Sequence, residues 1–230
     1  MRAIFLKEIK DYKVADSFTY SGDDFHHLKN VIRLKINDSV LVLDGEGLKV
    51  ETTCIEITKN HIKFYINNIQ KDVFHPRECI ISQIKRESLE LAFRSAVELG
   101  VTKFHIVKTD FSQNFKFNDD RLEKIGISAM IQSNNSYQCE IIYHSGISSL
   151  VDLTGENLII FDNSLDKKIE DSNKKQIMDS SPIIFIGPEG GFSENEIKKF
   201  KQMGALSHCF KSPILRSETA LIAAITYRYL

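Results

Sequence analysis

A glycine-rich segment follows a run of apolar residues near the C-terminal end of the chain. Residues 183–186 read Ile-Ile-Phe-Ile, and residues 187–193 read Gly-Pro-Glu-Gly-Gly-Phe-Ser. Four apolar residues, three of them β-branched, predict a strand that is buried on both faces. Pro188 has no N–H to continue that strand, and the Gly190-Gly191 pair can adopt positive φ without steric cost. The sequence therefore predicts a strand that ends in a tight glycine turn.

This turn has the composition of a ligand-binding corner. Ser193 precedes Glu196 by three residues, which is the capping-box pattern of a helix start, and ligands bind at such strand-to-helix corners in open α/β sheets. The segment does not fit G-x-G-x-x-G, and it lacks the Lys and Ser/Thr of a phosphate-binding loop. Glu189 adds a negative charge, which favours a cationic or neutral ligand over a nucleoside triphosphate. The alternative is a purely structural turn with a solvated Glu189.

A second corner lies close to the C-terminus. Residues 214–220 read Ile-Leu-Arg-Ser-Glu-Thr-Ala, and an apolar helical segment occupies residues 221–230. Ser217 or Thr219 can cap this helix, and Glu218 suits its positively polarised end. Because the helix is apolar nearly all round, it is expected to be buried in a core or against a partner chain.

Composition sets limits on the class of protein. The 230 residues are 42% hydrophobic and 27% charged, with a formal net charge of −1, as in an ordinary globular protein of two modest domains. Any contact with RNA must therefore come from a local basic face. No apolar run has the length of a membrane span, and the charged N-terminus does not resemble a signal peptide. The four scattered cysteines favour a reduced, cytoplasmic location and argue against a zinc site.

The first part of the chain reads as a small β domain over residues 1–72. Strands are expected at Ala3–Leu6, Ser17–Tyr20, Ser39–Leu43, Leu48–Ile57 and Ile62–Ile69. A helix is expected from about Asp24 to Leu34, with apolar residues on one face. The segment 71–78 contains Pro76 and no apolar periodicity, so the domain boundary is placed there.

The rest of the chain, residues 73–230, alternates between strand and helix patterns. Strands are expected at Cys79–Ile84, Lys103–Lys108, Leu158–Phe161, Ile183–Ile186 and Ser207–Phe210. Helices are expected at Arg86–Leu99, Asp119–Gln132, Lys167–Met178, Glu194–Met203 and along the C-terminal segment. This alternation predicts an α/β fold with a mostly parallel sheet.

Together the two corners resemble a known family. G-P-E-G-G-F-S followed by I-L-R-S-E-T-A is similar to the 16S ribosomal RNA uracil-N3 methyltransferases of the knotted SPOUT superfamily. The resemblance continues upstream through these matches: Phe25-His26-His27-Leu28, Val31-Ile32-Arg33-Leu34, Lys85 with Glu90, Val97-Glu98-Leu99-Gly100-Val101, and Ser128-Ala129-Met130 with Gln132-Ser133. It covers essentially the whole chain.

The resemblance carries expectations about fold and partners. It implies a SPOUT α/β methyltransferase domain with a trefoil knot over residues 73–230, and a PUA-like, RNA-binding β-barrel over residues 1–72. It implies S-adenosyl-L-methionine as cofactor, no metal, and a homodimer whose active site lies at the subunit interface. The implied substrate is a single uridine near the decoding centre, in the 16S ribosomal RNA of an assembled small subunit.

The resemblance also assigns roles to individual residues. The implied cofactor-binding set is Phe161, Ile186, Gly187, Pro188, Glu189, Gly190, Gly191, Ser212, Ile214, Leu215, Arg216, Glu218, Thr219 and Ala220. Arg216 and Glu189 are the candidate catalytic residues, and no general base is named. Arg216 is expected to contact RNA phosphate, uracil or the cofactor carboxylate, or alternatively to form a salt bridge with Glu218 or Glu189. Glu189 is either a contact to the sulfonium-bearing ligand or a solvated acid.

Candidate RNA contacts are basic or aromatic nitrogen-bearing side chains. They are Arg2, His26, His27, Lys29, Arg33 and Lys85. Such side chains can contact phosphates and position RNA without reading its sequence. The alternatives are solvated charges for the Lys and Arg residues, and a helix cap and a surface residue for the two histidines.

Four positions depart from the family pattern. Lys211 stands where a glycine is usual, Pro213 where a basic or polar residue is common, and Phe111 and Asn135 where basic residues are frequent. These departures keep three other functions open: a related enzyme with another RNA target, a non-catalytic RNA-binding descendant, and an α/β enzyme for a small nucleotide.

Overall fold

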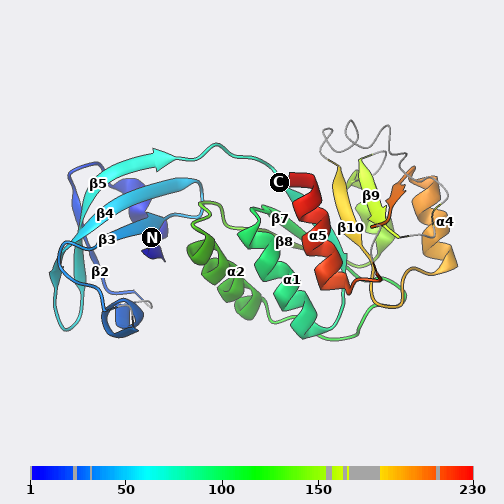
Figure 1. Cartoon of the computed structure of the whole chain (residues 1–230), viewed down its shortest axis with the longest axis horizontal. Coiled ribbons are helices and arrows are strands. Elements are labelled where there is room, and N and C mark those ends of the chain that lie inside the picture. The colour runs from blue at the N-terminus through cyan, green and yellow to red at the C-terminus, as the bar shows by residue number, and fades with distance from the viewer. Residues whose placement is uncertain are drawn as a thin grey trace. The chain divides into compact units, whose positions relative to one another are not determined.

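The computed structural model describes residues 2–22, 25–31, 33–153, 157–162, 165, 182–210 and 213–229. The chain forms two compact units (Figure 1). Unit 1 comprises Met1–His75 and Ile127–Gln138, and unit 2 comprises Pro76–Gly126 and Cys139–Leu230. The sequence assigned 127–138 to the second domain, whereas the structure places this segment in unit 1.

Unit 1 is built on a five-stranded sheet in the order β1-β3-β4-β5-β2. Its strands are β1 (Arg2–Phe5), β2 (Ser17–Tyr20), β3 (Ser39–Leu43), β4 (Leu48–Ile57) and β5 (Ile62–Lys71), and a 3-10 helix, η1 (Lys7–Asp11), follows β1. β1 runs parallel to β3, and the other pairs are antiparallel. Alternating strand residues such as Val40, Val42 and Phe64 are fully buried and form the core of the unit.

The helix expected at 24–34 is much shorter in the structure. Phe25 and His26 begin a helical turn that continues as the π-helix η2 (His27–Val31). Phe25 and Leu28 are buried, as the apolar spacing predicted, but Arg33 adopts a φ of 55°. A left-handed residue cannot continue a helix, so the predicted C-terminal half of the helix was wrong.

Unit 2 contains a six-stranded sheet in the order β11-β9-β10-β6-β7-β8, and all its pairs are parallel. The strands are β6 (Glu78–Ser82), β7 (Lys103–Val107), β8 (Glu140–His144), β9 (Leu158–Phe161), β10 (Ile183–Ile186) and β11 (Leu206–His208). The helices are α1 (Arg86–Glu98), α2 (Asp119–Ser133), α4 (Glu194–Gln202) and α5 (Ser217–Tyr229), with a 3-10 helix η3 (Ile147–Leu153). The predicted α/β fold with a parallel sheet is confirmed.

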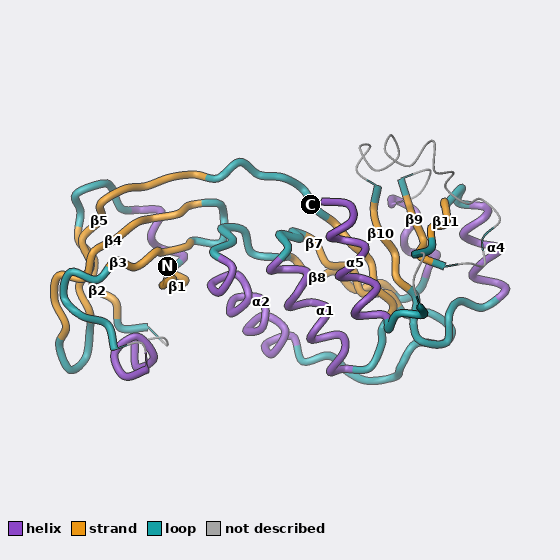
Figure 2. Tube along the Cα trace, viewed as in Figure 1, coloured by secondary structure: helices purple, strands orange, loops and turns teal. Residues whose placement is uncertain are grey.

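Helices cover both faces of this sheet. α5 packs on α1 and on strands β10 and β6, and the two helices lie side by side in Figure 2. On the other face, the ring of Phe185 in β10 packs against Phe192 and Phe200, the latter in α4. β10 is therefore covered on both sides, as its unbroken apolar run predicted.

Most predicted elements of unit 2 occur within two residues of their expected ends, with three exceptions. β8 and η3 were not predicted at all, and β11 begins one residue earlier and ends two residues earlier than expected. The helix expected at Lys167–Met178 lies outside the described residues.

Candidate active site

The site begins where β10 ends. Ile186 is 3% exposed, and the next residues form a turn in which the N–H of Gly191 donates to the carbonyl of Pro188 at 2.9 Å. Gly191 has a φ of 72°, a conformation that side chains with a Cβ rarely adopt. At Gly187 an added Cβ would lie 2.8 Å from the ring of Phe192. Both glycines are therefore required by the geometry of the loop.

The helix after this loop begins with the predicted capping box. The Ser193 side chain accepts from the N–H of Glu196, and the Glu196 carboxylate accepts from the N–H of Ser193 at 2.9 Å. The other oxygen of Glu196 accepts from the N–H of Asp110 at 2.9 Å. Asp110 follows β7, and its carboxylate accepts a hydrogen bond from the Ser193 hydroxyl. The start of α4 is thus fastened to the loop that leaves β7.

That second loop also touches the glycine turn. A Cβ on Gly190 would lie 3.2 Å from the Cβ of Phe111, so the backbone of Gly190 and the side chain of Phe111 are neighbours. On the other side, a Cβ on Gly191 would lie 3.9 Å from the carboxylate of Asp162, which follows β9. The loops after β7, β9 and β10 therefore meet at the carboxyl edge of the sheet, where ligands bind in such folds.

The second corner of the sequence is joined to the first. The hydroxyl of Ser217 donates to the carbonyl of Gly187 at 2.8 Å, which links the first turn of α5 to the glycine loop. Ser217 is the first residue of α5, and the N–H of Ala220 donates to the carbonyl of Arg216. The prediction that Ser217 or Thr219 caps the helix was wrong, because the Ser217 hydroxyl serves the link to the loop and Thr219 lies inside the helix.

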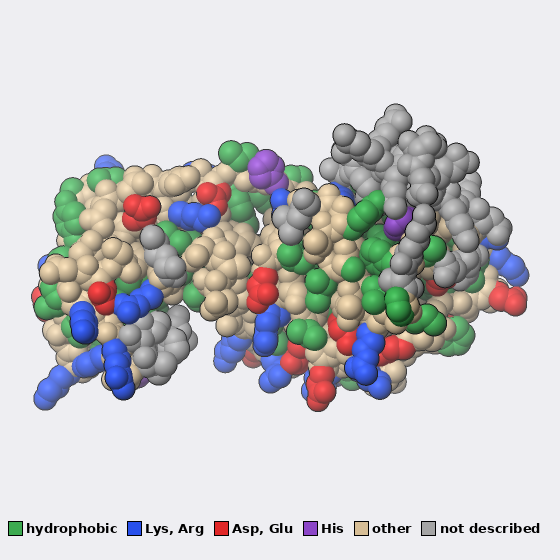
Figure 3. Space-filling view, viewed as in Figure 1, with side chains coloured by type: hydrophobic (Ala, Val, Ile, Leu, Met, Phe, Trp, Pro, Cys, Tyr) green, Lys and Arg blue, Asp and Glu red, His purple; other side chains and the backbone are tan. Residues whose placement is uncertain are grey.

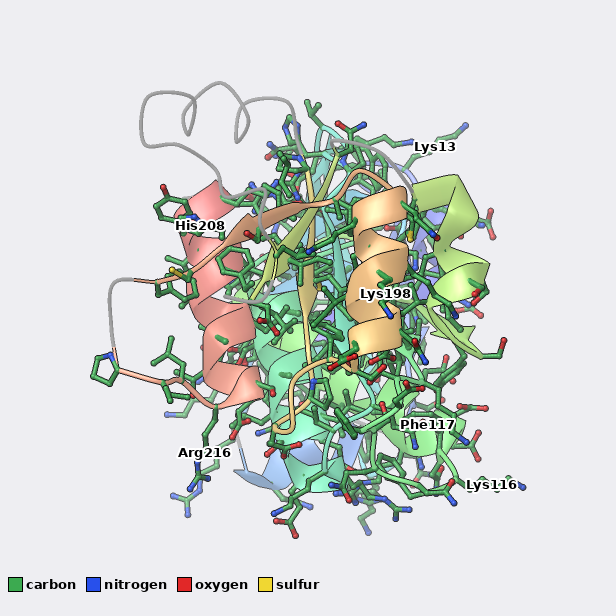
Figure 4. The ribbon with its side chains drawn as sticks, turned by 90° about the vertical axis from the view of Figure 1, so that its right-hand side faces the viewer. Lys13, Lys116, Phe117, Lys198, His208 and Arg216 are labelled. Carbon is green, nitrogen blue, oxygen red and sulfur yellow. The ribbon has the colours of Figure 1, made fainter. Side chains whose placement is uncertain are left out.

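The two candidate catalytic residues are exposed. Glu189 lies at the tip of the glycine loop, and Arg216 precedes the first turn of α5 with its side chain directed away from the helix (Figure 4). Within the described part of the chain, Arg216 forms no ion pair with Glu189 or Glu218. Glu218 is 7% exposed in the first turn of α5, where the helix dipole favours a negative charge. The guanidinium of Arg216 is consequently available to a ligand.

The remaining candidate cofactor residues differ in their exposure. Ile186 and Pro188 are buried; Phe161, Leu215 and Ala220 are half-buried; Thr219 and Ile214 are exposed. The Phe161 ring packs against His208 and Phe210 at 5.2 and 4.9 Å between centroids. Ser212 and Lys211 lie outside the described residues. The pairing of Ser217 with Gly187 and the contacts of Asp110 and Asp162 were not predicted from the sequence.

The candidate RNA contacts fall into two groups. In unit 1, the Lys29 ammonium lies 5.5 Å from the centre of the Phe25 ring and donates to the Thr58 carbonyl, and Arg2 pairs with Asp38. His26 and Arg33 are exposed, and basic side chains gather over the region of η2 in Figure 3. The side chain of His27 lies outside the description. In unit 2, Lys85 is exposed immediately before α1.

Two further features bear on the class of site. No group of three or more His, Cys, Asp or Glu side chains is arranged to hold a metal ion in the portions that the structure describes. In the same portions, no helix combines the length and apolar character that crossing a bilayer requires. The four cysteines are free thiols.

Comparison with known proteins assigns this architecture to a class. A family model described as an RNA methyltransferase domain matches residues 75–228, and one described as an RNA methyltransferase PUA domain matches residues 20–66. The fold is shared with the ribosomal RNA small subunit methyltransferase E of Neisseria gonorrhoeae bound to S-adenosyl methionine (TM-score 0.80, 22% identity, 99% of this chain and 96% of that one). It is also shared with a putative methyltransferase of Legionella pneumophila in complex with the same cofactor (TM-score 0.77, 21% identity, 98% and 95%). Unit 2 is therefore an RNA methyltransferase domain.

Sequence relatives narrow the class further. The chain is 32% identical to "Ribosomal RNA small subunit methyltransferase E 2" of Borreliella burgdorferi over 213 residues, which cover 88% of this chain and 86% of that protein. It is 25% identical to the ribosomal RNA small subunit methyltransferase E of Bacillus subtilis over 240 residues, with 93% and 91% coverage. The chain belongs to the RNA methyltransferase family that contains these ribosomal RNA small subunit methyltransferases E.

Proposed function

We propose that this protein transfers the methyl group of S-adenosylmethionine to N3 of a uridine in the 16S ribosomal RNA of the small subunit. The observation that carries the proposal is the hydrogen bond from Ser217 to the carbonyl of Gly187. It unites the two sequence motifs of the family at the carboxyl edge of one parallel sheet, which is where this class of fold binds ligands.

The glycine loop fits the proposed cofactor. Gly190 is exposed and carries no side chain, so a ligand can approach the backbone of the loop closely. The main-chain N–H and C=O groups of 187–191 can pair with the edge of an adenine. Glu189 places a carboxylate at the exposed tip, which suits a positively charged ligand rather than a phosphate.

The residues of the chain have two tasks in this reaction. When bound, S-adenosylmethionine supplies a methyl group on a sulfonium, which needs no metal for its activation. The site must place N3 of the base in line with that methyl group, which is a proximity effect, and must support loss of the N3 proton. The exposed Arg216 guanidinium is always charged and can donate to the uracil oxygens as negative charge develops.

The chemistry also restricts the state of the RNA. N3 lies on the edge of uracil that pairs with adenine, so the target base must be unpaired or turned out of its stack. We therefore propose an assembled small ribosomal subunit as the physiological partner, with exposed basic groups of unit 1, such as Arg33, contacting phosphates. A cytoplasmic location accords with this partner and with the free thiols.

We further propose that the protein acts as a homodimer. The buried face of α5, with Leu221, Ala224 and Ile225, packs inside the chain, so a partner would cover other residues. Ile214 is fully exposed just before the helix, and Tyr227 near its end is 42% exposed. Sedimentation equilibrium tests this assignment, and a monomer at micromolar concentration with cofactor present would contradict it.

Calorimetric titration with S-adenosylmethionine and S-adenosylhomocysteine is the first test of the cofactor. We expect binding of one molecule per site, and loss of binding in Gly190→Leu, whose side chain would fill the approach to the loop. Gly146→Leu is the matched control, because the nearest atom to its added Cβ is 3.9 Å away. Unchanged affinity in Gly190→Leu would contradict the assignment of the loop.

Mapping of the product tests the substrate. Small subunits from cells that lack the modification are incubated with the protein and S-adenosylmethionine, and their RNA is digested and analysed by mass spectrometry. We expect one N3-methyluridine. Methylation of a different nucleotide would indicate another RNA target, and RNA binding without cofactor binding would indicate a non-catalytic descendant.

A further inference from the structure

The loop from Thr109 to Asn118, which joins β7 to α2, lies against the proposed methyl-transfer site. Its second residue, Asp110, is bonded to both members of the capping box at the start of α4. Its third residue, Phe111, is the neighbour of Gly190 in the glycine turn. Any RNA segment that brings a base to the glycine loop must therefore pass close to Phe111.

The backbone of this loop is held firmly. The N–H of Gln113 donates to the carbonyl of Gln83 at 2.8 Å, and the Gln83 side chain donates to the carbonyl of Phe115 at 3.0 Å. At the start of the loop, the N–H of Thr109 donates to the hydroxyl of Ser112 at 2.9 Å, and the N–H of Ser112 donates back to the Thr109 carbonyl. Phe111 lies inside this closed turn, so its position is fixed by the fold.

Although its backbone is fixed, the side chain of Phe111 is 52% exposed. The nearby aromatic residues of the loop are placed differently: Phe115 and Phe117 are half-buried and contact each other with ring centroids 5.1 Å apart. An aromatic ring that is held rigidly yet left half in water offers a flat apolar face at low entropic cost, which is how single-stranded nucleic acids are bound.

Basic groups flank the same loop. The Arg86 guanidinium lies 5.2 Å from the centre of the Phe115 ring and donates to the carbonyl of Lys116. Lys85 and Lys116 are exposed, and Figure 4 shows Lys116 and Phe117 on the opposite side of the loop-bearing end of unit 2 from Arg216. The carboxylate of Asp110 is engaged by Ser193, which reduces its repulsion of phosphate. The combination of an aromatic face with nearby cations matches RNA rather than an apolar peptide.

We propose that Phe111 is a stacking platform for a base of the unpaired RNA segment that enters the site, with Lys85 and Lys116 beside its phosphates. This inference rests on the proposed function, because it takes single-stranded RNA as the substrate. It assigns to Phe111 a role in positioning RNA. Stacking on one aromatic side chain strengthens RNA binding by roughly tenfold to a hundredfold.

The test compares Phe111→Ala, Phe111→Leu and Phe111→Tyr with the unaltered protein. The probe is a short, unstructured, uridine-rich RNA that carries one 2-aminopurine, whose fluorescence is quenched by stacking. We expect the Ala and Leu variants to bind at least about tenfold more weakly and to lose the quenching, and the Tyr variant to retain both. Leu91→Ala, which removes another side chain that is about half exposed, is the control and should bind as the unaltered protein does.

Several results would overturn the proposal. They are absence of RNA binding by the unaltered protein, equal binding by Phe111→Ala, and full retention by Phe111→Leu, which would indicate apolar contact without stacking. A loss seen only with assembled subunits and not with the RNA probe would also overturn it, because it would point to a protein contact.

Failure of the proposed function gives a different result. In that case S-adenosylmethionine does not bind or no uridine is methylated, whereas the RNA titrations can still be read. If the enzyme is active, Phe111→Ala should raise KM for the small subunit about tenfold and leave the affinity for S-adenosylmethionine unchanged.

Discussion

Arg216 is the residue whose surroundings bear most directly on the chemistry. It is exposed, unpaired in the described structure, and one residue before the serine that is bonded to Gly187. Arg216→Ala should lower kcat by about a hundredfold, because a donor to developing negative charge is lost, and should change cofactor affinity much less. Steady-state kinetics and calorimetry on the same preparation measure both quantities.

The conservative variant makes this prediction sharper. Arg216→Lys keeps the charge but loses the planar pair of donors, so we expect only partial recovery of kcat. A guanidinium that served only the stability of the protein would leave kcat unchanged in Arg216→Ala, and that outcome would remove Arg216 from the reaction.

At the scale of elements, α4 depends on a single buried carboxylate. Glu196 is 5% exposed and accepts from the N–H groups of Ser193 and Asp110, so Glu196→Ala leaves two buried donors without a partner. We expect a loss of about 2 kcal/mol in the free energy of unfolding, measured by urea denaturation. Glu194→Ala, one turn position away and exposed, should change it by less than about 0.5 kcal/mol.

A second element-scale prediction concerns the link between α5 and the glycine loop. Ser217→Ala removes the hydrogen bond to Gly187 and should cost about 1 kcal/mol of stability. Because the loop is then less restrained, S-adenosylmethionine should bind more weakly. Unaltered cofactor affinity in a folded Ser217→Ala protein would show that the link is not needed for the site.

Strand patterns were readable from the sequence where burial was strong and boundaries were sharp. β2, β3, β4, β9 and β10 have the predicted bounds. The sheet edge was missed, because β8 is only partly buried and its residues do not alternate clearly between apolar and polar.

The motifs predicted the location of the candidate site but not its internal contacts. Ser217 and Gly187 are thirty residues apart, and no periodicity connects them. Phe111 was noted as a departure from the family, yet its exposure and its contact with Gly190 required coordinates. The trefoil knot stays a prediction, since periodicity carries no information on chain threading.

At the scale of the whole molecule, a buried polar pair links stability to pH. His105 is 3% exposed and its Nδ1 lies 2.9 Å from Nε2 of His144, with the Glu78 carboxylate 3.4 Å from its other nitrogen. Burial lowers the pKa of His105, although Glu78 opposes this, and burial also lowers the pKa of His144. Both rings therefore resist protonation in the folded state.

The sign of the effect follows from these directions. The unfolded chain takes up protons on these histidines near their ordinary pKa of 6.5, before the folded protein does, so stability should fall as the pH drops through that value. Melting temperatures measured from pH 8 to pH 5 test this. His105→Gln should flatten the curve, whereas His75→Gln, at an exposed position, should not. Equal slopes in both variants would exclude His105 as the cause.

The return of residues 127–138 to unit 1 has a consequence for how this protein can be divided. Tyr137 donates to the carbonyl of Asp72, Ser136 donates to the Asp72 carboxylate, and the N–H of Gly47 donates to the carbonyl of Ser136. A fragment that ends at His75 lacks these partners. We expect it to be less protected from amide hydrogen exchange along β4 and β5 than the same strands in the whole chain. A gene fusion or deletion at the linker would thus not transfer an intact module, and the two units must be inherited together.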